Sequence, residues 1–259
     1  MACHTVYRQM NRLVRGTEMG AFKLGLSVRD LNVRHPKTWG NGIATWVLMA
    51  LLFMPMAALA HPHMWVEGKA QLNFNAQGQV TGVTQTWVFD EMFSSYAKQG
   101  LPATSDNRPP QEELDKIGQS WIEALADPMS HYFTRITYGK REVPTAPAQR
   151  VRVDWDTATE QMSLRFELPL LEPLAPTDKP LVVSVADPTF YVAYSFEADD
   201  AISMMAAPER CDATYQRPER LDMETAQRLA AIGPDVTELP DDLMAVTQTL
   251  QHRVVVSCQ

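Results

Sequence analysis

Hydrophobic and polar residues alternate in short runs along most of this chain. Residues 66–74 and 80–89 alternate with a period of two, which is typical of strands with one buried face. The five residues between them read NAQGQ and supply Gly78 where a tight hairpin loop needs a positive φ. The pattern therefore predicts a β-hairpin over residues 66–89.

Three segments carry the marks of helices. Residues 90–99 begin with acidic residues, end with Lys98 and are followed by Gly100, which is the charge and glycine arrangement of a short helix. Residues 111–126 follow two prolines and place apolar residues three or four positions apart, on one face: Leu114, Ile117, Trp121 and Leu125. A polar helix is expected at 223–232.

Further strands are predicted at 132–138, 151–155, 162–168, 181–186, 191–196 and 250–258. The proline-rich segment 169–180 is expected to be a surface loop, because the chain after it is too short for a second core. We expect an α+β fold, mainly an antiparallel β-sheet arranged like a sandwich, with two or three helices. Residues 61–259 are predicted to form a single domain.

The N-terminal 60 residues have the features of an export leader. An apolar run over 39–59 follows the basic residues Arg29, Arg34 and Lys37, and it ends in the small-residue pattern Ala58-Leu59-Ala60. A basic region, an apolar core and an A-x-A exit define a secretory signal peptide. We therefore predict cleavage after Ala60 and a periplasmic protein that starts at His61.

A membrane anchor is the alternative for this segment, because the apolar run approaches the ~20 residues that a spanning helix needs. The late Pro55 and the lack of a basic cluster after Ala60 favour cleavage, so no stable membrane span is expected in the mature protein. The leader is unusually long, and Met10 or Met19 is a possible alternative start.

Removal of the leader makes the protein strongly acidic. The leader holds 7 of the 23 basic and 2 of the 31 acidic residues, so residues 61–259 keep 16 and 29 and a formal net charge of −13. Such a surface argues against nucleic acid or an anionic membrane face as partner, and it can concentrate cations. Simple solubility explains the charge equally well.

The two cysteines that remain after cleavage, Cys211 and Cys258, predict one disulfide in an oxidising compartment. In the loop-entropy account, closing a loop of about 48 residues contributes on the order of 4 kcal/mol to folding stability. A thiolate metal pair is the alternative, but neither cysteine has a C-x-x-C partner.

The strongest candidate chemistry lies at His61-Pro62-His63. Cleavage after Ala60 would give His61 a free α-amine beside its imidazole, and in an extended strand His63 points to the same side. Pro62 has no amide proton to lose, which excludes the square-planar clamp built from an amine, two amides and a third-position histidine. A site like a histidine brace or a zinc site remains, with further ligands drawn from elsewhere.

His131 and Asp187 are the favoured further ligands, because both are expected at strand ends; the other candidates are Glu67, Asp90, Glu91 and His252. Each has an alternative role. His131 can be a surface loop residue, and Asp187 can simply close a turn with Pro188-Thr189. Asp90-Glu91 can be only a helix start, and His252 can be structural.

Several of these segments together resemble one known family, the bacterial periplasmic proteins of unknown function that are often named uncharacterised periplasmic components of ABC-type transport systems. The matching pieces cover nearly all of residues 61–259: His61-Pro62-His63, Thr86-Trp87, Phe89-Asp90-Glu91-Met92-Phe93-Ser94, Tyr132-Phe133-Thr134, Asp187-Pro188-Thr189-Phe190-Tyr191, Cys211 and Val254-Val255-Val256-Ser257-Cys258. The resemblance implies a protein that acts beside zinc, nickel or cobalt transport.

One segment departs from that family's pattern. Many members carry an acidic loop like that of an EF-hand between their two helices, whereas residues 101–113 lack the D-x-[DN]-x-[DN]-G spacing and place Arg108 among the would-be ligands. We therefore expect no calcium site.

Three classes of function follow. The first is a periplasmic accessory protein that binds zinc, nickel, cobalt or copper at His61, His63, His131 and Asp187 and serves a membrane metal transporter. The second is a copper oxidoreductase with a histidine brace, and the third is an interaction domain without metal. An enzyme is less favoured: the sequence shows no flat aromatic substrate face and no second motif for the copper oxidoreductase, and no G-x-S-x-G or comparable motif for a nucleophilic hydrolase. The nitrogen ligands do not identify the metal, because imidazole and amine nitrogens bind nickel, copper, zinc and cobalt alike.

Overall fold

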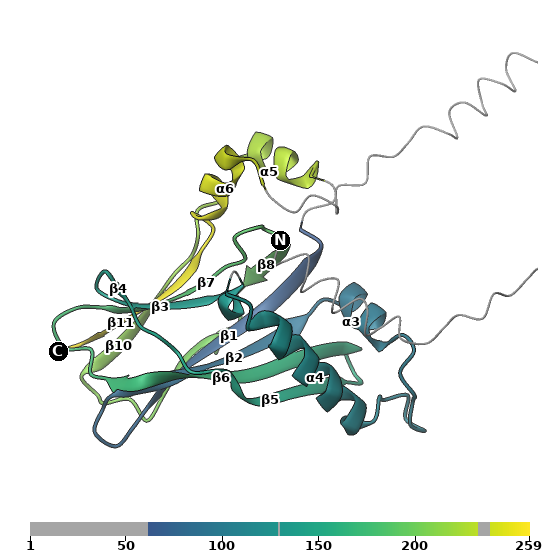
Figure 1. Cartoon of the computed structure of the whole chain (residues 1–259), viewed down its shortest axis with the longest axis horizontal. Helices are drawn as coiled ribbons and strands as arrows, with labels where there is room; N and C mark the ends of the chain where they lie inside the picture. Colours follow the sequence, from purple (N-terminus) through teal and green to yellow (C-terminus); the bar gives the residue numbers. More distant parts are fainter. Residues whose placement is uncertain (1–61, 129, 233–238) are drawn as a thin grey trace, which may run out of the picture. The chain divides into compact units, whose positions relative to one another are not determined.

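The computed structural model describes residues 62–128, 130–232 and 239–259 of the chain. Their strands form two sheets (Figure 1). The first, sheet A, has the strand order β5-β6-β2-β1-β8, and β9 also pairs with β1. Its strands are β1 (Met64–Phe74), β2 (Val80–Phe89), β5 (Gln149–Asp156), β6 (Gln161–Leu174), β8 (Val192–Ser195) and β9 (Ile202–Met205).

The second, sheet B, has the order β10-β11-β7-β3-β4 and is antiparallel throughout. Its strands are β3 (Thr134–Tyr138), β4 (Arg141–Glu142), β7 (Leu181–Val185), β10 (Cys211–Gln216) and β11 (His252–Cys258). Sheet A is mixed, because β8 and β9 run parallel to β1.

Four α-helices lie within the described residues: α3 (Glu91–Lys98), α4 (Gln111–Leu125), α5 (Met223–Ala230) and α6 (Asp241–Thr247). The expected α+β class with two sandwich-like sheets is confirmed, but the expected two or three helices are too few. The missed helix is α6, which has only seven residues. Within the described ranges no helix has the length and apolar character to cross a membrane.

One face of sheet A supplies most of the core. Along β1 the even-numbered residues from Met64 to Phe74 point inward, in the alternation that the sequence predicted. Toward one end this face packs on sheet B, through residues such as Leu72 and Val183. Toward the other end it packs on the helices, where Trp121 of α4 meets Phe89. Figure 1 shows α4 lying across β5 and β6.

The predicted hairpin is confirmed as β1 and β2, which pair antiparallel from Val66↔Phe89 to Phe74↔Val80. The Asn75 side chain holds its loop together by accepting hydrogen bonds from the backbone N–H groups of Gln77 and Gln79, at 3.0 and 2.9 Å. Gly78 adopts φ 70°, as the loop requires.

The expected surface loop at 169–180 is wrong in its first half, because β6 continues to Leu174. Pro169 lies opposite Gly82 of β2. A Cβ at Gly82 would come within 2.6 Å of the Leu168 carbonyl oxygen, so the absent side chain lets the two backbones approach. A strand that contains prolines is therefore tolerated here.

The last strands of sheet A are β8 and β9, which pair with successive parts of β1 and leave residues 196–201 between them. The ring of Phe196 lies over Gly68, where an added Cβ would come within 2.7 Å of it. Phe196 is 4% exposed and joins the core between the sheets. This arrangement fixes the edge of sheet A at which the candidate site lies.

Candidate functional site

His61 lies outside the described residues, and the structure first places the predicted site at His63. The backbone N–H of His63 donates to the carbonyl of Tyr191 at 2.9 Å. The two rings are stacked, with centroids 4.5 Å apart. One residue later β1 begins its parallel pairing with β8, Met64 opposite Val192. The segment that leads into β1 is thus attached to the edge of sheet A.

Asp187 belongs to the turn between β7 and β8 and is 3% exposed. One carboxylate oxygen accepts hydrogen bonds from the backbone N–H and the hydroxyl of Thr189, both at 2.8 Å. The other accepts from the backbone N–H of Val192 at 2.9 Å. Asp187 therefore has the turn-closing role that the sequence analysis gave as its alternative. The turn leads into β8, beside His63.

His131 lies in a left-handed turn before β3, with φ 48°. Its Nε2 is 4.0 Å from a carboxylate oxygen of Glu142, which also pairs with Arg135 at 3.2 Å. The structure therefore brings His63 and the Asp187 turn to one edge through Tyr191 and Val192, while His131 faces β4. Across the part of the chain that is described, no three His, Cys, Asp or Glu side chains group as metal ligands.

Asp90, another candidate, connects α3 to β1. One oxygen accepts from the Phe93 N–H at 2.8 Å and caps the helix, and the other accepts from the Trp65 N–H at 2.8 Å. Glu91 lies in the first turn of α3, where a negative charge favours the helix. The helix-start role proposed for both residues is present.

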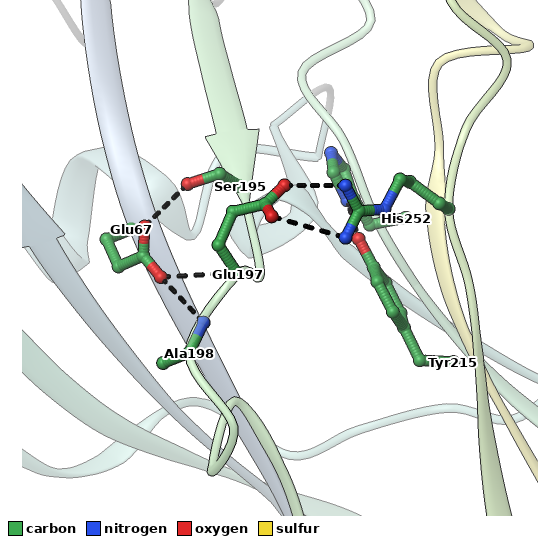
Figure 2. A network of polar contacts seen from close by, with 7 residues as sticks. Glu67, Ser195, Glu197, Ala198, Tyr215 and His252 are labelled. Atoms are coloured by element: carbon green, nitrogen blue, oxygen red, sulfur yellow. Dashed lines mark hydrogen bonds and ion pairs between the residues drawn. The ribbon is translucent and has the colours of Figure 1, made fainter.

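Glu67 and His252 take part in a polar network at the same edge of sheet A (Figure 2). The carboxylate of Glu67 accepts hydrogen bonds from the Ser195 hydroxyl at 2.7 Å and from the backbone N–H groups of Glu197 and Ala198, at 3.3 and 3.2 Å. It thereby holds the chain as it leaves β8.

The Glu197 side chain turns the other way and forms a two-pronged ion pair with Arg217, at 2.8 and 3.2 Å. Arg217 follows β10, so this pair connects the edge of sheet A to the end of sheet B. Sequence reasoning missed Glu197, Tyr215 and Arg217. Nothing in their spacing distinguishes them from surface residues, because they come together only through the pairing of β8 and β11 with their neighbours.

His252 contacts Tyr215, whose hydroxyl lies 2.6 Å from its Nδ1. Burial lowers the pKa of His252 to about 4. A hydrogen bond with the backbone of Tyr194 acts in the opposite direction but is the smaller effect. Burial also raises the pKa of Tyr215. At neutral pH the imidazole is therefore uncharged, and the Tyr215 hydroxyl donates to Nδ1 while the other ring nitrogen keeps its hydrogen.

A pocket of about 440 Å³ opens beside this network, between β8 and the segment that follows β10. Its walls include the apolar Phe190, Val192 and Leu221, and His252 and Arg217 also line it. The volume is in the range of small-molecule sites. Among its charged lining residues, Asp187 and Glu219 offset Arg217 and Arg220, and His252 is neutral.

The predicted disulfide between Cys211 and Cys258 is present, with the Cα atoms 4.0 Å apart. The two cysteines lie directly opposite each other, at the start of β10 and the end of β11. Both are buried, at 5% and 6% exposure. The bond closes the segment that carries α5, α6 and one wall of the pocket.

These features define a disulfide-bonded α+β domain of two sheets, with a histidine anchored where its first strand begins. The chain belongs to the DUF1007 family, described as a protein of unknown function, whose model matches residues 46–258. It is also 21% identical over 215 residues to an uncharacterized protein of Haemophilus influenzae, which covers 83% of this chain and 99% of that protein. The similarity runs through both sheets and all four described helices.

Proposed function

We propose that this is a periplasmic accessory protein that binds a divalent transition metal at its processed N-terminus and passes it to a membrane transporter. The ion would be zinc, nickel, cobalt or copper. The observation that carries the proposal is the attachment of His63 to Tyr191, which fixes the end of the chain that cleavage would create.

The geometry of β1 supports a shared site for His61 and His63. β1 is extended from Met64 onward. If the backbone stays extended for the three residues before it, the two histidines lie on one side of the strand. The α-amine and imidazole of His61 and the imidazole of His63 then offer three nitrogen ligands. Because the Nε2 atom of His63 is enclosed by the protein, an ion there would be bound through Nδ1.

The surroundings support an exchangeable site. The oxygens of Asp187 hold the Thr189 and Val192 N–H groups, and His131 lies beside Glu142. Use of either as a metal ligand would require these contacts to break. Three nitrogens from the chain end leave a coordination position open, as in sites that take up a further ligand. An open position suits delivery to a transporter.

Location in the periplasm is supported by the disulfide, since such bonds persist in oxidising compartments. It also agrees with the leader, whose cleavage after Ala60 would create the amine. Both steps are open to direct measurement, because the mature protein would begin at His61 and would contain no free thiol.

The test is a calorimetric titration of nickel, zinc, cobalt and copper into protein that begins at His61, and into protein with one alanine before it. The extension moves the amine away, so binding of at least one metal should weaken roughly tenfold or more if the amine is a ligand. His63→Asn should weaken binding similarly, while the matched variant His131→Asn should leave it unchanged if the ligands are those at the chain end.

Equal affinities with and without the added alanine would contradict the role of the amine. A loss of binding in His131→Asn as large as that in His63→Asn would show that the site is closed by the body of the protein. If none of the four metals binds, the proposed function is wrong.

A further inference from the structure

A second pocket, of about 230 Å³, opens where β3 and β7 meet the C-terminal end of α6. Arg135 is the one charged residue among those described that line it, and no acidic residue does. The polar side chains around it are neutral: Ser130, Ser184, Thr247, Gln248 and Gln251. In a protein whose residues 61–259 carry a formal net charge of −13, a pocket lined by an arginine and by no described carboxylate offers a local site for an anion.

The pairing of sheet B adds a second cation beside the pocket. Ser184 lies directly opposite Arg135 on β3 and directly opposite Arg253 on β11. Side chains at opposite positions of antiparallel strands share one face and lie about 5 Å apart at their Cβ atoms. Ser184 therefore has an arginine position on either side of it in the sheet, and of the two Arg135 lines the pocket. The pair of Arg135 with Glu142 is about half exposed on both sides, so solvent weakens it.

Ser130 provides an independent indication of a ligand. It is 5% exposed, and its hydroxyl oxygen has no hydrogen-bond partner within the described ranges, although a buried hydroxyl normally has one. The next three residues, His131 to Phe133, have φ values of 48, 54 and 45°. This left-handed conformation is unfavourable for residues other than glycine, and Ser130, directly before it, lines the pocket.

The remaining walls decide the class of ligand. Phe133, Ala186 and Pro188 give the pocket an apolar side. A bare inorganic anion would leave that side without a complementary contact, whereas a short carbon chain would fill it. Arginine binds carboxylate through two parallel hydrogen bonds, and the serine and glutamine side chains suit a hydroxyl.

We propose that this pocket binds a small hydroxy-carboxylate, with its carboxylate on Arg135 and its polar groups on Ser130 and Ser184. The site is independent of the N-terminal histidines. It gives the protein a means of recognising an organic anion whether or not a metal is bound.

The experiment titrates L-lactate, acetate and inorganic phosphate into the disulfide-bonded protein, followed by calorimetry or by NMR shifts. Lactate should bind saturably and more tightly than acetate. Arg135→Gln should weaken lactate binding about tenfold or more, because a hydrogen bond to a charged group is lost. Arg152→Gln is the matched control: Arg152 is similarly exposed and paired with Asp154, but lies on β5 of the other sheet, so lactate affinity should not change.

Ser130→Ala separates binding from folding. Because the hydroxyl has no partner within the described chain, its removal should leave the unfolding midpoint unchanged or raised, while lactate binding weakens severalfold. Failure of lactate and acetate to bind, or equal lactate affinity in Arg135→Gln, would overturn the proposal. Binding of phosphate alone would overturn the assignment to a carboxylate.

Discussion

The protonation of single residues in the polar network depends on how deeply they are buried. His252 shows this most clearly, since its imidazole bonds Tyr215 and its pKa is lowered to about 4. The unfolded chain would protonate the same residue near pH 6.5, the ordinary histidine value. The unfolded state therefore binds more protons between these two values, and folding stability rises with pH in that window.

We predict that His252 makes the protein less stable as the pH falls from about 6.5 to about 4. Partial exposure limits the loss to on the order of 1–2 kcal/mol. Urea unfolding of the wild type and His252→Gln at pH 7 and at pH 4.5 measures it, and the variant should lose less stability on acidification. An equal loss in both proteins would show that His252 does not titrate in this window.

The candidate ligands show what sequence alone can establish about a site. It predicted the Asp187 turn as an alternative, because an Asp before Pro-Thr is a local pattern. It did not predict that His131 faces Glu142 or that His63 stacks on Tyr191. Those contacts join segments far apart in the chain, and the side chains carry no mark of their partners.

At the scale of elements, Asp90 connects a helix to a strand. Because its two oxygens serve the Phe93 and Trp65 N–H groups, Asp90→Ala should lower the free energy of unfolding by about 1–2 kcal/mol. Asp222→Ala is the matched control, since Asp222 caps α5 through Thr225 and bonds nothing outside that turn in the contacts described. Asp222→Ala should lower the free energy of unfolding by less than Asp90→Ala does. Urea unfolding would contradict the bridging role if Asp222→Ala cost as much.

Elements with a strong local pattern could be predicted, and those defined by their neighbours could not. The hairpin of β1 and β2 and the helix α4 follow from periodicity, and both are confirmed. β10 was missed because it is a polar edge strand, with exposed residues between half-buried ones. β6 runs past Pro169 because Gly82 lies opposite, a fact that no pattern within β6 contains.

The disulfide acts on the pair β10 and β11. We expect Cys211→Ala with Cys258→Ala to lower the free energy of unfolding by about 2–4 kcal/mol, since the unfolded chain would gain freedom over the enclosed loop. Guanidinium unfolding with and without a reducing agent measures this. The agent should destabilise the wild type and leave the double variant unchanged, and an unaffected wild type would argue against a stabilising bond.

At the scale of the whole molecule, the proposed metal site makes binding depend on pH. Histidine and amine nitrogens must lose their protons before they bind a metal, so affinity should decline below about pH 8, the ordinary α-amine value, and fall more steeply as the pH drops through about 6.5, the histidine value. Calorimetric titrations at pH 7.5 and 5.5 test this. An affinity that is the same at both values would exclude ligation by histidine.

The position of the disulfide has one more consequence. Because Cys211 and Cys258 lie opposite each other, every residue from 212 to 257 lies inside a covalent ring. A protease that cuts once within α5 or α6 would leave two fragments still joined through sulfur. Such a nicked molecule would migrate as one band until a reductant separated it, so proteolysis could open this segment without releasing it.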